Sequence, residues 1–168
     1  MKDRTRLAAC VLIALLVAVT GIVRLAAPAA TVSRIEHQQQ MREAELRQRF
    51  EQAVVMLHAR QYEHAVTALH RVLELAPRLP EAHVNMGYAL VGLQQHEAAR
   101  AFFEAAVALN PRQANAYYGL ALVAEQQQDR EAALGAMRTY LHFAPAGDAH
   151  VARARAALWE WEQQPGRH

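Results

Sequence analysis

Apolar positions recur every three or four residues along most of the chain after residue 46, in segments of about three helical turns. Short polar breaks separate these segments, as at Gln94-Gln95 and at residues 126–129. Spacing of this kind is typical of amphipathic helices with one buried face. The pattern therefore predicts pairs of helices joined by short turns.

The helix pairs repeat with a fixed period. Pro77, Pro111 and Pro145 stand 34 residues apart, and other columns keep the same period. These columns hold small residues at Ala53, Gly87 and Ala121 and at Ala65, Ala99 and Ala133, and large apolar residues at Leu69, Phe103 and Met137. We interpret the small residues as sites of close helix approach and the large ones as filling between units. Proline, which lacks an amide hydrogen, ends each second helix.

These columns resemble the tetratricopeptide repeat (TPR) family. Tyr117, Leu120 and Ala121 in the third unit resemble the aromatic–Leu–Gly motif of the family's first helix. In the first unit, Arg49 and Gln52 depart from this motif. The resemblance covers about residues 46–145. It implies a right-handed solenoid whose first helices line a concave groove for a peptide or a helix.

We expect an all-α fold: a TPR solenoid of three helix-turn-helix repeats plus a C-terminal capping helix, preceded by a transmembrane helix. The expected boundaries are 1–30 for a cytoplasmic tip and membrane anchor, 31–46 for a helical stalk, 47–79, 80–113 and 114–146 for the repeats, 147–163 for the capping helix and 164–168 for a tail. A disordered tether is the alternative for the stalk. Asp148 is the expected N-cap of the last helix, and one of Trp159 and Trp161 should be buried, because they point to opposite faces.

The N-terminus carries 17 consecutive uncharged residues, Leu7 to Val23. As a helix they span about 25 Å, at the short limit for crossing a bilayer. We expect a signal anchor that contacts the membrane through residues 7–27. A cleaved signal peptide stays open, because Ala27-Pro28-Ala29 has the small-x-small form of a cleavage site. Positive charge is denser before the span, so in a bacterium the N-terminus would be cytoplasmic and the repeats periplasmic, on a single-pass inner-membrane protein.

The resemblance also locates the groove columns. They hold mostly apolar and aromatic groups, where family members that clamp a C-terminal carboxylate carry Lys, Asn and Arg. The candidate partner-binding residues are Phe50, Val54, Leu57, Val84, Asn85, Tyr88, Val91, Asn115, Tyr118 and Leu122. We expect an apolar groove for a hydrophobic or amphipathic segment, with Tyr118 in contact with the partner. The alternative is that Phe50, Val84 and Leu122 are partly core or are covered by the C-terminal helix or the stalk.

Composition and motifs argue against other classes of function. A net charge of +2 with mixed signs is too weak for a nucleic-acid surface. Nine histidines include no i, i+4 pair and no HExxH, and the single Cys10 excludes an intrachain disulfide. Without a phosphate loop or catalytic constellation we expect a non-enzyme with no cofactor and no metal. A metal-dependent enzyme using the histidines is the remaining alternative.

We therefore expect a membrane-tethered scaffold that binds a protein or peptide partner. By resemblance, small anchored TPR proteins of this layout aid assembly of envelope or membrane complexes, such as cytochrome c maturation, secretion or respiratory machinery. The alternative is a permanent accessory subunit of a membrane protein complex, held also by its span, where Gly21 permits close helix packing.

Overall fold

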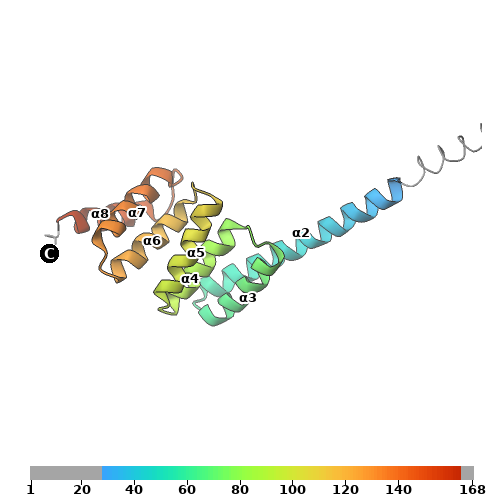
Figure 1. Ribbon diagram of the computed structural model, residues 1–168, viewed down its shortest axis with the longest axis horizontal. Coiled ribbons are helices and arrows are strands. Elements are labelled where there is room, and N and C mark those ends of the chain that lie inside the picture. Colours follow the sequence, from blue (N-terminus) through green and yellow to red (C-terminus); the bar gives the residue numbers. More distant parts are fainter. Residues whose placement is uncertain (1–27, 164–168) are drawn as a thin grey trace, which may run out of the picture. The chain divides into compact units, whose positions relative to one another are not determined.

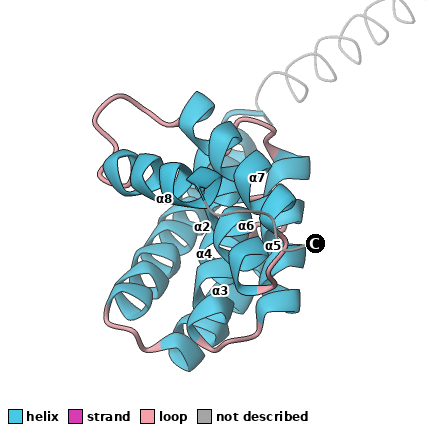
Figure 2. Cartoon of the chain, turned by 90° about the vertical axis from the view of Figure 1, so that its left-hand side faces the viewer, coloured by secondary structure: helices cyan, strands magenta, loops and turns pink. Residues whose placement is uncertain are grey.

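A computed structural model of the protein describes residues 28–163. All regular secondary structure in this part of the chain is helical (Figure 2). The expected membrane anchor, residues 7–27, and the tail, residues 164–168, lie outside the described residues. Among the helices of residues 28–163, none has the length and apolar character needed to span a membrane.

Seven helices make up the described chain (Figure 1). They are α2 (Pro28–His58), α3 (Tyr62–Leu75), α4 (Pro80–Gly92), α5 (His96–Leu109), α6 (Ala114–Gln126), α7 (Arg130–Phe143) and α8 (Val151–Gln163). The chain divides into two compact units, Met1–Glu45 and Leu46–His168. In the first unit, the side chains of residues 33–45 are all exposed on α2.

The second unit contains the repeats. From Leu46 onward, α2 with α3, α4 with α5 and α6 with α7 form three helix pairs, and α8 follows. Each helix from α3 to α7 packs on the helix that follows it, and α4 also contacts α6. The expected all-helical solenoid of three repeats plus a terminal helix is therefore confirmed for the described residues.

Each repeat changes direction through a residue with left-handed backbone. Arg60, Gln94 and Gln128 have φ near +60° and stand 34 residues apart. The residue after each one donates its N–H to a carbonyl five positions back, as from Gln95 to Leu90 at 2.9 Å. This is a Schellman-type helix end, which glycine usually forms. The second helices end differently, two residues before the repeated prolines.

Two of the repeated prolines, Pro77 and Pro111, accept a hydrogen bond from the helix that follows. Tyr117 donates its hydroxyl to the Pro111 carbonyl oxygen at 3.0 Å. His83 Nε2 lies 2.9 Å from the Pro77 carbonyl oxygen, and because a carbonyl can only accept, Nε2 carries the proton. Each turn between repeats is thus fastened to the first helix of the next repeat.

Close helix packing surrounds Phe103 of α5. Its side chain is fully buried. Leu69 and Met137, which occupy the same column in the other two repeats, are each at most 1% exposed. A Cβ atom added at Gly87 of α4 would lie 2.5 Å from Phe103 Cε1, and one added at Gly119 of α6 would overlap the ring as well. The two glycines therefore let α4 and α6 approach the same ring from two sides.

The terminal helix α8 is fastened near its C-terminal end. Trp161 is 7% exposed and donates Nε1 to Glu125 of α6 at 3.0 Å. Arg130 at the start of α7 donates from Nη2 to the Trp161 carbonyl oxygen at 2.6 Å. Trp159 is 66% exposed, so the expected split between one buried and one exposed tryptophan is confirmed. The N-cap expectation for Asp148 is wrong, because α8 begins only at Val151.

The packing around Phe103 predicts opposite effects for two glycine-to-alanine changes. Gly119→Ala should lower the free energy of unfolding by about 1–3 kcal/mol, because the new methyl group enters a filled core. Gly135→Ala in α7 should raise it by about 0.5–1 kcal/mol, because the site is exposed, helical and has open space. Urea unfolding followed by circular dichroism measures both, and equal changes for the two variants would contradict the packing.

Candidate functional site

Five apolar side chains form a partly exposed row on the first helices of the three repeats, which we call the first-helix row. The row consists of Val54 and Leu57 on α2, Tyr88 and Val91 on α4, and Leu122 on α6. Each is neither fully buried nor fully exposed. Residues three apart share one face of a helix, and equivalent columns in successive repeats extend that face across the stack. These five predicted residues are thus open to contact.

Tyr88 is the most firmly held member of the first-helix row. Its ring meets the Phe103 ring edge-on with the centroids 5.1 Å apart. Its hydroxyl donates to the backbone carbonyl oxygen of Asn115 on α6 at 2.7 Å. Burial raises the pKa of Tyr88 well above its ordinary value of 10.0, so the side chain stays neutral. An aromatic group fixed at both ends offers contact area at little entropic cost.

Two of the predicted groove residues, Val84 and Tyr118, do not lie on an open surface. Val84 is 3% exposed and Tyr118 is 7% exposed. Val84 belongs to a core cluster that includes Ala116 of the next first helix. The Tyr118 ring lies under His150, which precedes α8, with the centroids 5.3 Å apart. In this column, Val84 is therefore covered by the next first helix and Tyr118 by the segment before α8. For Val84, this agrees with the alternative that it is part of the core.

The other three predicted residues, Phe50, Asn85 and Asn115, lie on the same first helices as the first-helix row. Phe50 is half-buried and packs against the core, Asn85 is half-buried, and Asn115 is exposed. The Asn115 carbonyl oxygen already accepts from Tyr88. No partner is present in the structure, so the binding role of all ten residues stays a prediction.

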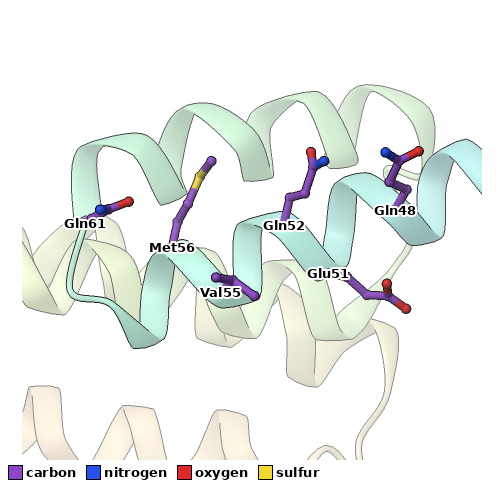
Figure 3. Close-up of a pocket in the computed structure, with 6 residues that line it drawn as sticks. All are labelled: Gln48, Glu51, Gln52, Val55, Met56 and Gln61. Atoms are coloured by element: carbon purple, nitrogen blue, oxygen red, sulfur yellow. The ribbon is translucent and has the colours of Figure 1, made fainter.

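A shallow hollow lies elsewhere, at the edge of the first repeat (Figure 3). It is lined by Gln48, Glu51, Gln52, Val55, Met56 and Gln61, and by none of the predicted groove residues. Its columns explain it: Gln48, Gln52 and Val55 stand 34 residues before Ala82, Met86 and Ala89, which are fully buried. In the second repeat, this face of α4 packs against α3 of the repeat before it. The corresponding face of α2 has no preceding repeat to cover it in the described chain, and the hollow lies there.

Sequence reasoning missed a cluster between α6, α7 and the start of α8. Tyr140 is fully buried, its ring lies 5.1 Å from the Tyr118 ring, and its hydroxyl makes no hydrogen bond of good geometry. Burial raises the pKa of Tyr140, and the adjacent Asp148 carboxylate raises it further. A signal did exist, because Tyr140 occupies the column in which the second repeat has the small Ala106.

Asp148 organises the segment that covers this cluster. Its Oδ1 accepts the backbone N–H of His150 at 2.7 Å and lies 3.2 Å from His150 Nδ1. The backbone hydrogen bond is the main cause that lowers the pKa of Asp148; partial burial opposes it, and the Tyr140 and His150 side chains add to it. The carboxylate is therefore ionised at neutral pH.

The residues described by the structure show no constellation for metal binding. Within residues 28–163, no group of three or more His, Cys, Asp or Glu side chains is placed to hold a metal ion. The arrangement offers apolar surface and hydrogen-bonding groups, which suit binding of another polypeptide.

The comparisons with known proteins agree with this fold. The tetratricopeptide repeat family model matches residues 50–111 and 84–149, which together make up more than half of the chain. The chain belongs to the tetratricopeptide repeat family. No curated protein matches the sequence significantly.

Solved TPR structures share the fold at low sequence identity. The first TPR of Spaghetti (RPAP3), bound to the HSP90 peptide SRMEEVD, is 20% identical, with a TM-score of 0.63 over 70% of this chain and 90% of that one. PcrH, in complex with the chaperone binding region of PopD, is 19% identical, with a TM-score of 0.66 over 71% and 92%. The Yersinia enterocolitica chaperone SycD, with a peptide of the translocator YopD, is 12% identical, with a TM-score of 0.65 over 71% and 93%. All three are similar in fold and hold a peptide or binding region of a partner.

The hydrogen bonds to Asp148 predict a pH-dependent contribution to stability. A carboxyl whose pKa is lowered by folding stabilises the fold above its unfolded pKa of about 3.9, and this is lost as the pH falls through the folded value. At neutral pH, Asp148→Asn should lower the free energy of unfolding by roughly 1 kcal/mol. As the pH falls through the lowered folded pKa of Asp148, the variant and the wild-type protein should converge. Urea unfolding at neutral pH and along a series of acidic pH values tests this, and a constant difference would contradict it.

Proposed function

We propose that this protein is a membrane-tethered TPR scaffold whose first-helix row binds a hydrophobic or amphipathic segment of a partner protein. The row carries the proposal, because it places five partly exposed apolar side chains in equivalent columns of three consecutive repeats. Burying each of them against a partner would contribute up to about 1.5–3 kcal/mol. TPR neighbours that hold peptide segments of other proteins add support.

The charge of the row favours an uncharged partner segment. Its five members carry no charge, and the acidic Glu125, which occupies the column of Leu57 and Val91 in the third repeat, already accepts a hydrogen bond from Trp161. The HSP90 peptide bound by the Spaghetti domain contains acidic residues. An acidic peptide needs cations for charge-assisted hydrogen bonds, and Phe50 and Val54 supply none. We therefore propose apolar contacts, with hydrogen bonds to the ligand backbone from Asn85 and Asn115.

A membrane tether would increase the effective concentration of the row near membrane-bound partners. We propose residues 7–27 as a single-pass anchor in a bacterial inner membrane, with the N-terminus cytoplasmic and the repeats periplasmic. The uncharged run from Leu7 to Val23 supports the anchor. The partner would then belong to an envelope or membrane complex under assembly, in cytochrome c maturation, secretion or respiratory machinery.

Site-specific photo-crosslinking tests the binding face. A photoreactive residue at Val91 should give a discrete partner adduct, whereas one at Ala101, an exposed position on α5, should not. Adding Leu122→Asp should reduce the Val91 adduct tenfold or more, because a charge replaces about 1.5–3 kcal/mol of apolar burial. Ala101→Asp is the matched control. Equal adducts from both positions, or an unchanged yield with Leu122→Asp and unchanged helicity, would contradict the proposed face.

Membrane extraction tests the tether. The full chain should stay with membranes in high salt and in alkaline carbonate and should be released by detergent, because an apolar span is held by lipid and not by charge. A chain that begins at Pro28 should be released in salt and keep its helical circular dichroism. The intact mass of the membrane-bound protein provides the control, and a mass that lacks residues 1–29 would identify a cleaved signal peptide instead.

A further inference from the structure

The segment Ala144–His150, between α7 and α8, covers the aromatic pair Tyr118 and Tyr140. The His150 ring contacts the Tyr118 ring with the centroids 5.3 Å apart and the planes tilted by 52°. Beneath it, the Tyr118 and Tyr140 centroids are 5.1 Å apart. Tyr118 is 7% exposed, whereas the His150 side chain above it is 53% exposed. A partly solvated ring thus shields a buried one.

Short-range hydrogen bonds hold this segment in its conformation. Asp148 donates its N–H to the Pro145 carbonyl oxygen at 3.1 Å and accepts from the His150 N–H at 2.7 Å. The Asp148 carboxylate also lies 3.2 Å from His150 Nδ1. Gly147 has φ of +87°, which an L-residue adopts only under strain, and it has open space around it. The conformation therefore depends on one carboxylate and one glycine.

The surface beneath the segment continues the binding face. Tyr118 occupies a groove column of α6, four residues before Leu122 of the first-helix row. The equivalent residue one repeat earlier, Val84, is buried in a cluster of helical side chains. The ring over Tyr118 comes from a non-helical connection instead. The Tyr140 hydroxyl is enclosed beneath the segment and interacts with the Asp148 carboxylate without a hydrogen bond of good geometry.

We propose that Ala144–His150 is a movable cover that closes the third-repeat end of the first-helix row and lifts to expose Tyr118 and Tyr140 to a partner segment. The cover is an autoinhibitory contact within the chain. The inhibitory role of the cover rests on the proposed function of the first-helix row. The movement of the cover is independent of that function. Opening exchanges the His150 ring for a side chain of the partner and extends the face beyond Leu122.

Hydroxyl-radical footprinting of the full chain, read by mass spectrometry, measures the movement without any partner. His150→Ala removes the covering ring, and Asp148→Ala removes the acceptor that holds it. In both variants the modification rate of Tyr118 should rise several-fold, while the half-exposed Tyr117 should be unchanged as an internal reference. His70→Ala, at an exposed position on α3, is the matched control and should leave Tyr118 protected.

A third variant keeps the test decisive if one of these fails to fold. Gly147→Ala leaves every ring and hydrogen-bonding group in place but disfavours the backbone conformation of the segment. It too should increase the modification of Tyr118. Unchanged protection of Tyr118 in all folded variants, judged by circular dichroism, would overturn the cover.

The inhibitory role is tested by the crosslink from Val91. If the cover competes with the partner, the yield of the partner adduct should rise in the His150→Ala variant and not in the His70→Ala control. A rise in Tyr118 modification in the Gly147→Ala variant, which keeps the His150 ring, without a rise in adduct would overturn inhibition but leave the movement established. Absence of an adduct in every variant, the wild-type protein included, would overturn the proposed binding face and the inhibitory role with it, while footprinting still decides whether the segment moves.

Discussion

The insertion of one aromatic ring between two glycines underlies the organisation of the repeat stack. Phe103 of α5 occupies the space that Cβ atoms at Gly87 and Gly119 would need. The first helices of two successive repeats therefore meet the same ring. The ring also supports Tyr88 edge-on, and the Tyr88 hydroxyl reaches the backbone carbonyl of Asn115 on the next first helix. The partly exposed binding face is thus positioned by a fully buried contact.

Much of this interior could be predicted from the sequence, because a repeat period constrains many columns at once. The columns of Leu69, Phe103 and Met137 had to be large and apolar to fill the space between units, and all three are buried. The outward columns were harder. Helical periodicity identifies the face on which Tyr118 and Val84 lie, but the element that covers this face comes from elsewhere in the chain.

Features that depart from the repeat could not be predicted from its period. The residues with left-handed backbone at the helix ends are Arg60, Gln94 and Gln128. A glycine at these positions would have indicated a helix end in the sequence, whereas arginine and glutamine do not. The cluster of Tyr140 and Asp148 arises because the third repeat is followed by a single helix after a longer connection. By contrast, polar Gln48 and Gln52 in otherwise apolar columns do indicate in the sequence that the first repeat has an open face.

The hydrogen bonds at the end of α8 have a mechanical consequence. The carbonyl oxygens at the C-terminal end of a helix have no N–H donors within the helix and carry partial negative charge. Arg130 donates a hydrogen bond to one of them, the carbonyl oxygen of Trp161, and its positive charge offsets that partial charge. The final turn of α8 is therefore held at its end, and the fully buried Ala154 holds its first turn against the core. These two points lie about 10 Å apart along the helix axis, so α8 resists pivoting as a whole. Lifting His150 from Tyr118 therefore falls to the non-helical residues 144–150, which precede the helix.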